Sequence, residues 1–322
     1  MQYRKLGRTG IEVSEIGYGA WGIGGSQWGG ADDDESVQAL GRAIDLGLTF
    51  VDTALAYGGG RSERIVGRVL RERSEQVHVA TKVPPKNQVW PAQDGVPVDE
   101  VFPGAYVREC AERSLENLGL EHIDLLQFHV WSDEWVRQGD WLEAIEDLRS
   151  SGAIRHFGVS INDHQPANAL RLIESGAVDS VQVIYNLFDQ SAEDELFPAC
   201  REHDVGVIAR VPLDEGGLTG TIGPDTEFAD GDFRSYYFRG DRKRELEERT
   251  GAIVADLGIA EDALAETALR FILSEPAVST VIPGMRSLRN VERNVAVSDG
   301  RGLPDEQREK LRAHRWVRDF YR

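Results

Sequence analysis

The sequence predicts an α/β protein built as a (β/α)8 TIM barrel. Across its 322 residues, short β-branched runs alternate with amphipathic helical patterns, and eight such strand-like runs can be counted. Several helical patterns end in a glycine directly after the last apolar position, which is a common helix stop. Because no linker interrupts the composition, we expect a single domain over residues 1–322, although the length would also suit two.

The elements follow in order along the chain. An N-terminal β-hairpin is expected first, with short strands on either side of Gly7–Gly10. The eight barrel strands are then expected at 13–19, 48–52, 77–82, 123–129, 155–160, 180–186, 205–210 and 279–284. Two segments exceed the repeat: a long loop insertion after the seventh strand (212–260), which contains a charged helix, and a polar C-terminal helical tail (304–322).

Composition argues against several classes of protein. The 36 Lys and Arg residues face 55 Asp and Glu residues, and a net charge of −19 disfavours nucleic-acid binding. Apolar runs long enough to cross a membrane, about 18 residues, are absent from the sequence. Cys110 and Cys200 are too few for a disulfide framework or a metal cluster, so we expect a cytoplasmic protein without metal or membrane partners.

Residues 17–22 formally match G-x-G-x-x-G, the dinucleotide fingerprint of Rossmann folds. Asp52, which ends the next strand, would then be the ribose-binding acid. That motif works because its glycines open a helix whose amides bind the pyrophosphate. Here helical patterning begins only near Asp33, and Asp52 lies too far along the chain. We therefore interpret this segment as a loop at the barrel mouth.

Four polar residues coincide with the ends of consecutive strands. Asp52 ends the second strand with Tyr57 just beyond it, Lys82 ends the third strand, and His129 ends the fourth. Because parallel barrel strands present their carboxyl ends at one face, we expect these four side chains to meet there.

These residue types suit proton donation to a carbonyl oxygen. A tyrosine pKa of about 10 is too high for an efficient acid at neutral pH, and we expect the Lys82 ammonium to lower the pKa of Tyr57. Asp52 would hold Lys82, and His129 would orient the carbonyl. Each residue alone has a structural explanation, such as a helix cap, a surface tyrosine or a core histidine. Their joint occurrence at successive strand ends favours function.

Six longer segments carry a resemblance to a known family: FVDTALAYGGGRSERIVGRVL, VATKV, IDLLQFHVW, IRHFGVSIN, VQVIYNLFDQ and VIPGMRSLRNVERNVAV. Through them the chain resembles the aldo-keto reductase superfamily over nearly its whole length. The resemblance implies an oxidoreductase that binds a nicotinamide cofactor, usually NADPH, without a Rossmann domain and reduces a carbonyl to an alcohol. It implies Tyr57 as general acid, supported by Lys82 and Asp52, with His129 beside the developing oxyanion.

The resemblance also implies a set of cofactor-binding residues. They are Ser160, Asn162, Gln182, Arg210, Leu213, Gly217, Leu218, Gly284, Arg286, Asn290 and Asn294. Ser160, Asn162 and Gln182 would contact the nicotinamide carboxamide, loop 213–220 the pyrophosphate, and Arg286 the 2′-phosphate of NADP. Structural alternatives remain, since Asn162 could cap the next helix and Gln182 could be an ordinary strand residue.

Two departures from the family pattern affect these expectations. Arg210 stands where many members carry an aromatic ring against the nicotinamide, and its positive charge would disfavour the oxidised ring. We therefore predict that reduction is faster than oxidation. Gly284-Met285 replaces the Lys or Ser that some members use for the 2′-phosphate, so NADP is expected through Arg286, with NAD as the alternative.

The substrate is the least defined feature of the sequence. Trp21 and Trp131 are expected to form pocket walls for a small-molecule carbonyl substrate, and further tryptophans lie in nearby loops. They would suit an apolar or aromatic aldehyde, or a sugar. Two other functions stay open: an NAD-dependent sugar or alcohol dehydrogenase, and a cofactor-binding regulatory subunit. The sequence does not decide whether the chain forms a homo-oligomer.

Overall fold

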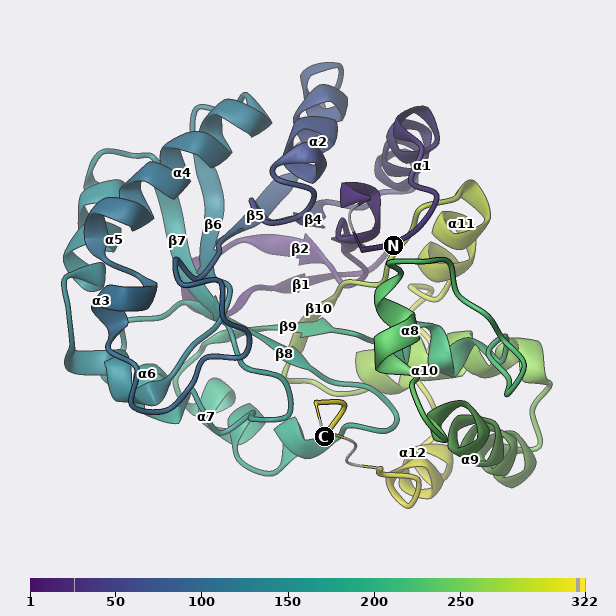
Figure 1. Cartoon of the computed structure of the whole chain (residues 1–322). Coiled ribbons are helices and arrows are strands. Elements are labelled where there is room, and N and C mark those ends of the chain that lie inside the picture. Colours follow the sequence, from purple (N-terminus) through teal and green to yellow (C-terminus); the bar gives the residue numbers. More distant parts are fainter. Residues whose placement is uncertain (26, 317–318, 322) are drawn as a thin grey trace.

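The computed structural model describes residues 1–25, 27–316 and 319–321, and these form a closed barrel (Figure 1). Eight strands form one sheet in the order β10-β9-β8-β7-β6-β5-β4-β3, with parallel pairing throughout. Their bounds are β3 Tyr18–Gly19, β4 Phe50–Asp52, β5 His78–Val83, β6 Ile123–Phe128, β7 Ile154–Ser160, β8 Ser180–Ile184, β9 Gly206–Arg210 and β10 Val278–Val281. Parallel bridges from Ile16 to Val281 and from Gly19 to Gly284 join the first and last strands. The predicted (β/α)8 fold is confirmed.

The first barrel strand differs from its prediction. Residues 13–19 were expected as one strand, but Glu12–Ser14 forms β2 of the hairpin and only Tyr18–Gly19 pairs as β3. The chain changes partner in between, because Gly17 donates its backbone N–H to Val281 O, 2.8 Å away. This single run therefore serves both the hairpin and the barrel.

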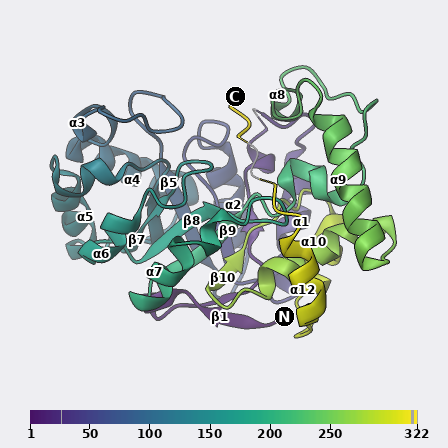
Figure 2. The same ribbon diagram turned by 90° about the horizontal axis from the view of Figure 1, so that it is seen from below.

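The N-terminal hairpin closes one end of the barrel. Strand β1 (Tyr3–Lys5) pairs antiparallel with β2 around a 3₁₀ turn, η1 (Gly7–Thr9). Leu6 and Val13 are fully buried and pack with residues from the barrel interior. Gly7 is required here, because a Cβ on its left-handed backbone would lie 2.3 Å from Gly206 N. Figure 2 shows β1 at the opposite end of the molecule from α8. Because the hairpin closes the barrel at the β1 end, the open mouth of the barrel is at the end where α8 lies.

Helices surround the barrel and cover most of its apolar outer surface (Figure 1). Those of the repeat are α1 Asp33–Asp45, α2 Arg61–Arg71, α3 Val98–Val101, α4 Gly104–Leu118, α5 Trp141–Ser150, α6 Leu170–Ser175, α7 Leu196–Glu202, α10 Leu264–Leu273 and α11 Leu288–Ala296. Further 3₁₀ turns are η2 Gly22–Gly24, η3 Asp133–Arg137, η4 Ser191–Glu193, η5 Asp214–Thr219 and η6 Glu261–Ala263. Helix α1 shows how sequence sets a boundary: the Asp32 side chain accepts from Glu35 N and caps its start.

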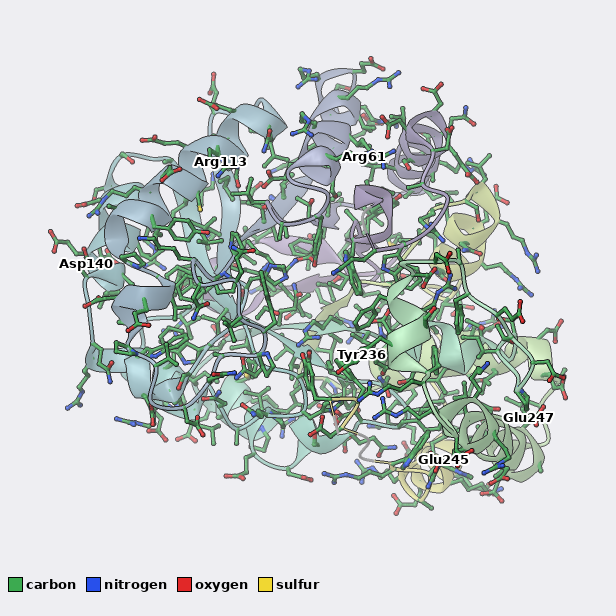
Figure 3. The ribbon with its side chains drawn as sticks, in the orientation of Figure 1. Arg61, Arg113, Asp140, Tyr236, Glu245 and Glu247 are labelled. Atoms are coloured by element: carbon green, nitrogen blue, oxygen red, sulfur yellow. The ribbon has the colours of Figure 1, made fainter. Side chains whose placement is uncertain are left out.

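The insertion after β9 and the C-terminal tail lie on one side of the barrel. The insertion forms α8 (Phe233–Tyr237) and α9 (Arg242–Leu257), and the tail forms α12 (Asp305–Arg312) beside α9. The charged helix and the tail helix are as expected. Figure 3 shows Glu245 and Glu247 of α9 at the outer edge and Tyr236 of α8 nearer the middle of the view. None of the described helices is long and apolar enough to span a membrane.

Candidate active site

The four polar residues predicted at the strand ends come together at the mouth of the barrel. The buried Lys82 Nζ lies 2.5 Å from Asp52 Oδ2 and 3.2 Å from Tyr57 Oη. The ring of His129 lies 5.6 Å from the ring of Tyr57, centroid to centroid, and nearly perpendicular to it. Lys82 thus links a carboxylate to a phenol whose ring adjoins that of a histidine.

Two glutamines hold the other oxygen of Asp52. Gln127 Nε2 and Gln182 Nε2 donate to Asp52 Oδ1 over 3.1 and 2.7 Å. Gln127 was not predicted from the sequence, although a period-2 argument could have found it: it precedes His129 by two residues and so points to the same face of the strand. Gln182 Nε2 also approaches Gln127 Oε1 at 3.4 Å, so its nitrogen is committed within the protein and its oxygen remains available to a ligand.

Burial controls the protonation of the cluster. It raises the pKa of Tyr57 above its ordinary value; the Lys82 ammonium lowers this pKa, as expected, but only partly offsets the effect of burial. Burial disfavours the ammonium of Lys82, but Asp52 and Tyr57 outweigh it and raise its pKa. Burial, then Lys82 and Arg210, hold the pKa of His129 well below its usual range. At neutral pH the cluster holds a neutral phenol, an ammonium and a neutral imidazole.

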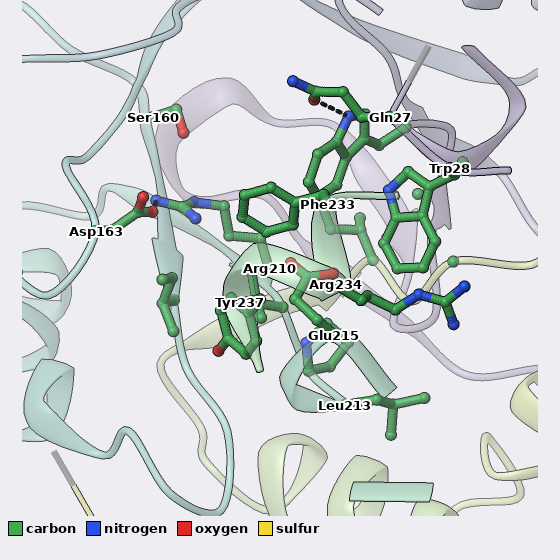
Figure 4. A pocket seen from close by; sticks show the side chains of 18 of the residues that line it. Gln27, Trp28, Ser160, Asp163, Arg210, Leu213, Glu215, Phe233, Arg234 and Tyr237 are labelled. Atoms are coloured by element: carbon green, nitrogen blue, oxygen red, sulfur yellow. Dashed lines mark hydrogen bonds and ion pairs between the residues drawn. The ribbon is translucent and has the colours of Figure 1, made fainter. Parts of the chain in front are cut away.

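A cavity of about 750 Å³ opens over this cluster. It extends from Tyr57 and His129 past β7, β8 and β9 to the start of α11. Figure 4 shows part of its wall, from Ser160 and Asp163 to Trp28 and Arg234. The predicted site residues that line it are Trp21, Asp52, Tyr57, His129, Ser160, Asn162, Gln182, Arg210, Leu213, Gly284, Arg286 and Asn290. The cavity therefore collects residues from segments spread over nearly the whole chain.

Trp131 was expected as a pocket wall, and this is wrong. Its side chain is fully buried outside the barrel, with its ring 5.3 Å from the ring of Trp141 in α5. Its indole Nε1 donates to Asp133 in the same loop, because the chain after His129 turns outward toward α5. Within the described chain, the tryptophans on the cavity wall are Trp21, Trp28 and Trp90.

Three of the expected cofactor residues also lie away from the cavity. Gly217 faces Leu246 of α9, and Leu218 is fully buried in the core. Gly216 and Thr219 line the cavity instead, because the backbone of η5 is kinked. Asn294 is buried one helical turn beyond Asn290, and of these two asparagines Asn290 is the one that lines the cavity.

Arg210 is not an isolated charge. Its guanidinium pairs with Asp163 Oδ1 at 2.6 Å and donates to Ile161 O at 2.8 Å. Figure 4 shows the side chain extended toward Asp163 along the cavity floor. Tyr321 from the C-terminal tail donates to the other oxygen of Asp163, at 2.5 Å. Neither Asp163 nor Tyr321 was predicted from the sequence as part of this site.

The opposite end of the cavity is cationic and aromatic. Arg234 of α8 and Arg286 each lie near the indole of Trp28, with guanidinium carbons 4.7 and 5.6 Å from its ring centre. Arg286 also donates to Gly29 O over 2.9 Å, which ties the segment before α11 to the loop before α1. Arg234 comes from the insertion and was missed, because a helix in an insertion carries no strand-end signal.

The residues fit the nicotinamide dinucleotide that the resemblance implies. Three buried polar atoms of cavity-lining residues have no hydrogen-bond partner in the described chain: His129 Nδ1, Arg210 Nε and Trp28 Nε1. They are spread along the cavity, with acceptors and donors of β7 and β8 at one end and guanidinium groups at the other. This donor set matches a long ligand with an amide at one end and phosphates at the other.

A parallel barrel with a buried Asp–Lys pair, a half-buried tyrosine beside it and a long, partly cationic cavity at its mouth fits the barrel oxidoreductase class that the resemblance implies. The model described as Aldo/keto reductase family matches residues 15–315, and the chain belongs to this family. Among curated proteins it is similar to the uncharacterized oxidoreductase YqkF of Bacillus subtilis (30% identity, covering 98% of this chain and 96% of the relative). It is also similar to the aldo-keto reductase YhdN of Bacillus subtilis (31% identity, covering 91% and 87%).

Solved structures show the same relationship. Glycerol dehydrogenase AKR11B4 from Gluconobacter oxydans superposes with a TM-score of 0.77 at 30% identity, covering 97% of this chain and 94% of that chain. An aldo-keto reductase from Klebsiella pneumoniae, crystallised in complex with NADPH, gives a TM-score of 0.71 at 26% identity and covers 99% and 98%.

Proposed function

We propose that the enzyme reduces an aldehyde or ketone to an alcohol with NADPH, and that Tyr57 is the general acid. The observation that carries this proposal is the 3.2 Å contact between Tyr57 Oη and Lys82 Nζ, whose ammonium is paired with Asp52 inside the barrel. Tyr57 keeps its proton at neutral pH, because burial raises its pKa. When Tyr57 gives that proton to a carbonyl oxygen, the Lys82 ammonium stabilises the phenolate that is left.

Neutral His129 has a different part in this proposal. An imidazole that stays uncharged can donate one N–H to the substrate oxygen without competing as an acid. Its Nδ1 has no partner in the described chain and its ring adjoins Tyr57, so both donors can address the same oxygen. NADPH, when bound, supplies the hydride.

Other residues would hold that cofactor. Ser160 and the oxygen of Gln182 suit the nicotinamide carboxamide, since both line the cavity above Asp52. Arg286, with Asn290 beside it, is the candidate for the 2′-phosphate. The substrate would enter between the aromatic walls, and we propose an uncharged carbonyl compound for this reason.

NAD-dependent sugar or alcohol oxidation is the second candidate, and one observation favours use of NAD. A hollow of about 180 Å³ beside Arg286 is also lined by Asp32 and Glu35. These carboxylates oppose the charge of a 2′-phosphate, whereas a plain ribose would carry no charge to oppose. A regulatory subunit with little turnover is less well supported, because such a protein has no need of the Tyr57–Lys82 pair.

We also propose that residues 1–322 act as one domain in the cytoplasm. The tail supports the first point, since Trp316 N donates to Phe188 O over 2.8 Å and Tyr321 reaches the cavity. The second is supported by Cys110 and Cys200, which are free and buried.

The test is Tyr57→Phe, assayed with a panel of aldehydes and both NADPH and NADH. Removing the proton donor should lower kcat by about 10²- to 10⁴-fold and leave the Kd for NADPH unchanged. Tyr236→Phe is the matched control, because the exposed side chain of Tyr236 lines the cavity on α8 and is not among the groups that Lys82 Nζ hydrogen-bonds in the described chain. Tight NADPH binding by the wild-type enzyme with no turnover across the panel would favour the regulatory role instead.

A further inference from the structure

The side chain of Asn162 forms hydrogen bonds to the backbone of the loop between β5 and α3. Its Oδ1 accepts from Ala92 N and its Nδ2 donates to Ala92 O, both over 3.1 Å. Nδ2 also donates to Gln165 Oε1 over 3.0 Å. Asn162 is only 4% exposed, so these bonds are shielded from water. Both amide hydrogens are therefore used, and a single acceptor position remains on Oδ1.

The loop to which Asn162 is hydrogen-bonded also carries Trp90, whose ring lies beside that of His129. Trp90 lies two residues before Ala92, and its ring is 6.0 Å from the ring of His129 at an angle of 89°. Trp21 stands on the other side, with its ring 6.3 Å from the ring of Tyr57. The two indoles thus flank the position where a carbonyl would meet Tyr57 and His129.

The other hydrogen bonds that join this loop to the rest of the described chain lie near the ends of the loop. Lys86 N donates to Val101 O, Gly95 N donates to Glu134, and Val96 O accepts from Trp135. Between Gln88 and Gly95, the bonds from Asn162 are the ones that tie the loop to the barrel within the described part of the chain. Trp90 is 39% exposed, so packing alone holds it weakly.

We propose that Asn162 is a positioning residue for the substrate pocket: by holding Ala92 it fixes Trp90 as a wall above His129 and selects carbonyl substrates with a flat apolar substituent. This inference rests on the proposed function. It differs from the carboxamide contact that the family resemblance assigns to Asn162. With one acceptor position left, Asn162 can take a single N–H from a ligand while it holds the loop, so its larger effect falls on the substrate.

A double-mutant cycle separates these roles. Asn162→Ala, Trp90→Ala and the double variant are compared with the wild-type enzyme, using benzaldehyde and propanal as substrates. Asn162→Ala should raise the KM for benzaldehyde roughly tenfold, because it removes the two hydrogen bonds to Ala92, with a smaller effect on propanal. In the Trp90→Ala background the same change should have less than about a twofold effect, because the wall is already gone. Additive effects would overturn the inference.

Two further variants test whether the effect comes from the bonds between Asn162 and Ala92. Ala92→Pro removes the backbone N–H that donates to Asn162 Oδ1 and leaves the Asn162 side chain in place. It should therefore raise the KM for benzaldehyde without changing the Kd for NADPH. Gln165→Ala removes a partner of Asn162 but not its bonds to Ala92, and should leave the KM unchanged. If Asn162→Ala raises the Kd for NADPH more than about tenfold while Ala92→Pro has no effect on the KM, the inference is wrong.

The inference can fail separately from the proposed function. Absence of turnover in the wild-type enzyme contradicts the proposed function alone. The same four proteins of the cycle are therefore also titrated with benzyl alcohol, so that the coupling between Asn162 and Trp90 is measured as a Kd. Coupling within experimental error of zero in that titration overturns the inference.

Discussion

Replacing Lys82 by methionine tests whether the buried ion pair holds the site together. The change keeps most of the side-chain length but removes the ammonium, which contacts Asp52 Oδ2, Thr53 O and Tyr57 Oη. Gln127 and Gln182 still donate to Oδ1 of Asp52, but Oδ2 loses its partner. Breaking one side of a buried pair costs about 3–5 kcal/mol, because the remaining charge stays buried without compensation.

Urea unfolding measures this loss. With an m value of about 3 kcal/mol/M, the midpoint should fall by roughly 1–1.7 M. The matched control is the double variant Lys82→Met with Asp52→Asn, in which no net charge remains buried and the amide oxygen still accepts from both glutamines. It should recover most of the stability, since replacing both charged partners is much less costly than orphaning one.

The activity of Lys82→Met should fall together with its stability. Removing the ammonium takes away the group that lowers the pKa of Tyr57, so that pKa rises further and the phenolate is less stabilised. We expect a loss in kcat of about 10²-fold or more. A cost below about 1 kcal/mol, or a double variant as unstable as the single one, would refute the electrostatic reasoning.

Two further predictions concern the cofactor side of the cavity. Burial and the neighbouring Asp214 raise the pKa of Glu215 from 4.5 to about 8, so the native state favours the protonated form and loses stability, relative to Glu215→Gln, as the pH rises through that range. Urea unfolding of both proteins at about pH 5 and about pH 9 checks this, and parallel curves would contradict it. Arg286→Ala should raise the KM for NADPH about tenfold or more and leave the KM for NADH nearly unchanged. An unchanged KM for NADPH would remove Arg286 from the 2′-phosphate site.

The reacting cluster could be predicted because barrel geometry converts strand ends into spatial neighbours. Asp52, Lys82 and His129 each lie at or directly after a strand end, and parallel pairing brings those ends to one face. Gln127 was within reach of the same argument, two residues before His129. The effect of burial on Tyr57 could not be predicted in this way. The sequence shows that an ammonium lies nearby, but it does not show how far the surrounding loops exclude water from the phenol.

Loop residues could not be placed from the sequence. Trp131 follows a strand end just as Tyr57 does, yet the chain turns outward after His129 and the indole packs against α5. Beyond the end of a strand there is no period that fixes which way a side chain points. Likewise, Tyr321 and Asp163 are 158 positions apart, and only the path of the tail brings them together.

The structure changes the reasoning about Arg210. A lone guanidinium beneath the nicotinamide would disfavour the positively charged oxidised ring, which was the basis for predicting that reduction is faster than oxidation. Asp163 pairs with it at 2.6 Å, and the phenol of Tyr321 donates to that carboxylate and supports its negative charge. The field at the cavity floor is therefore that of a compensated pair, which falls off much faster with distance than that of a single charge. Pairing with Asp163 therefore weakens the electrostatic preference that Arg210 would exert, and the faster rate of reduction stays a prediction that kinetic measurement in both directions tests.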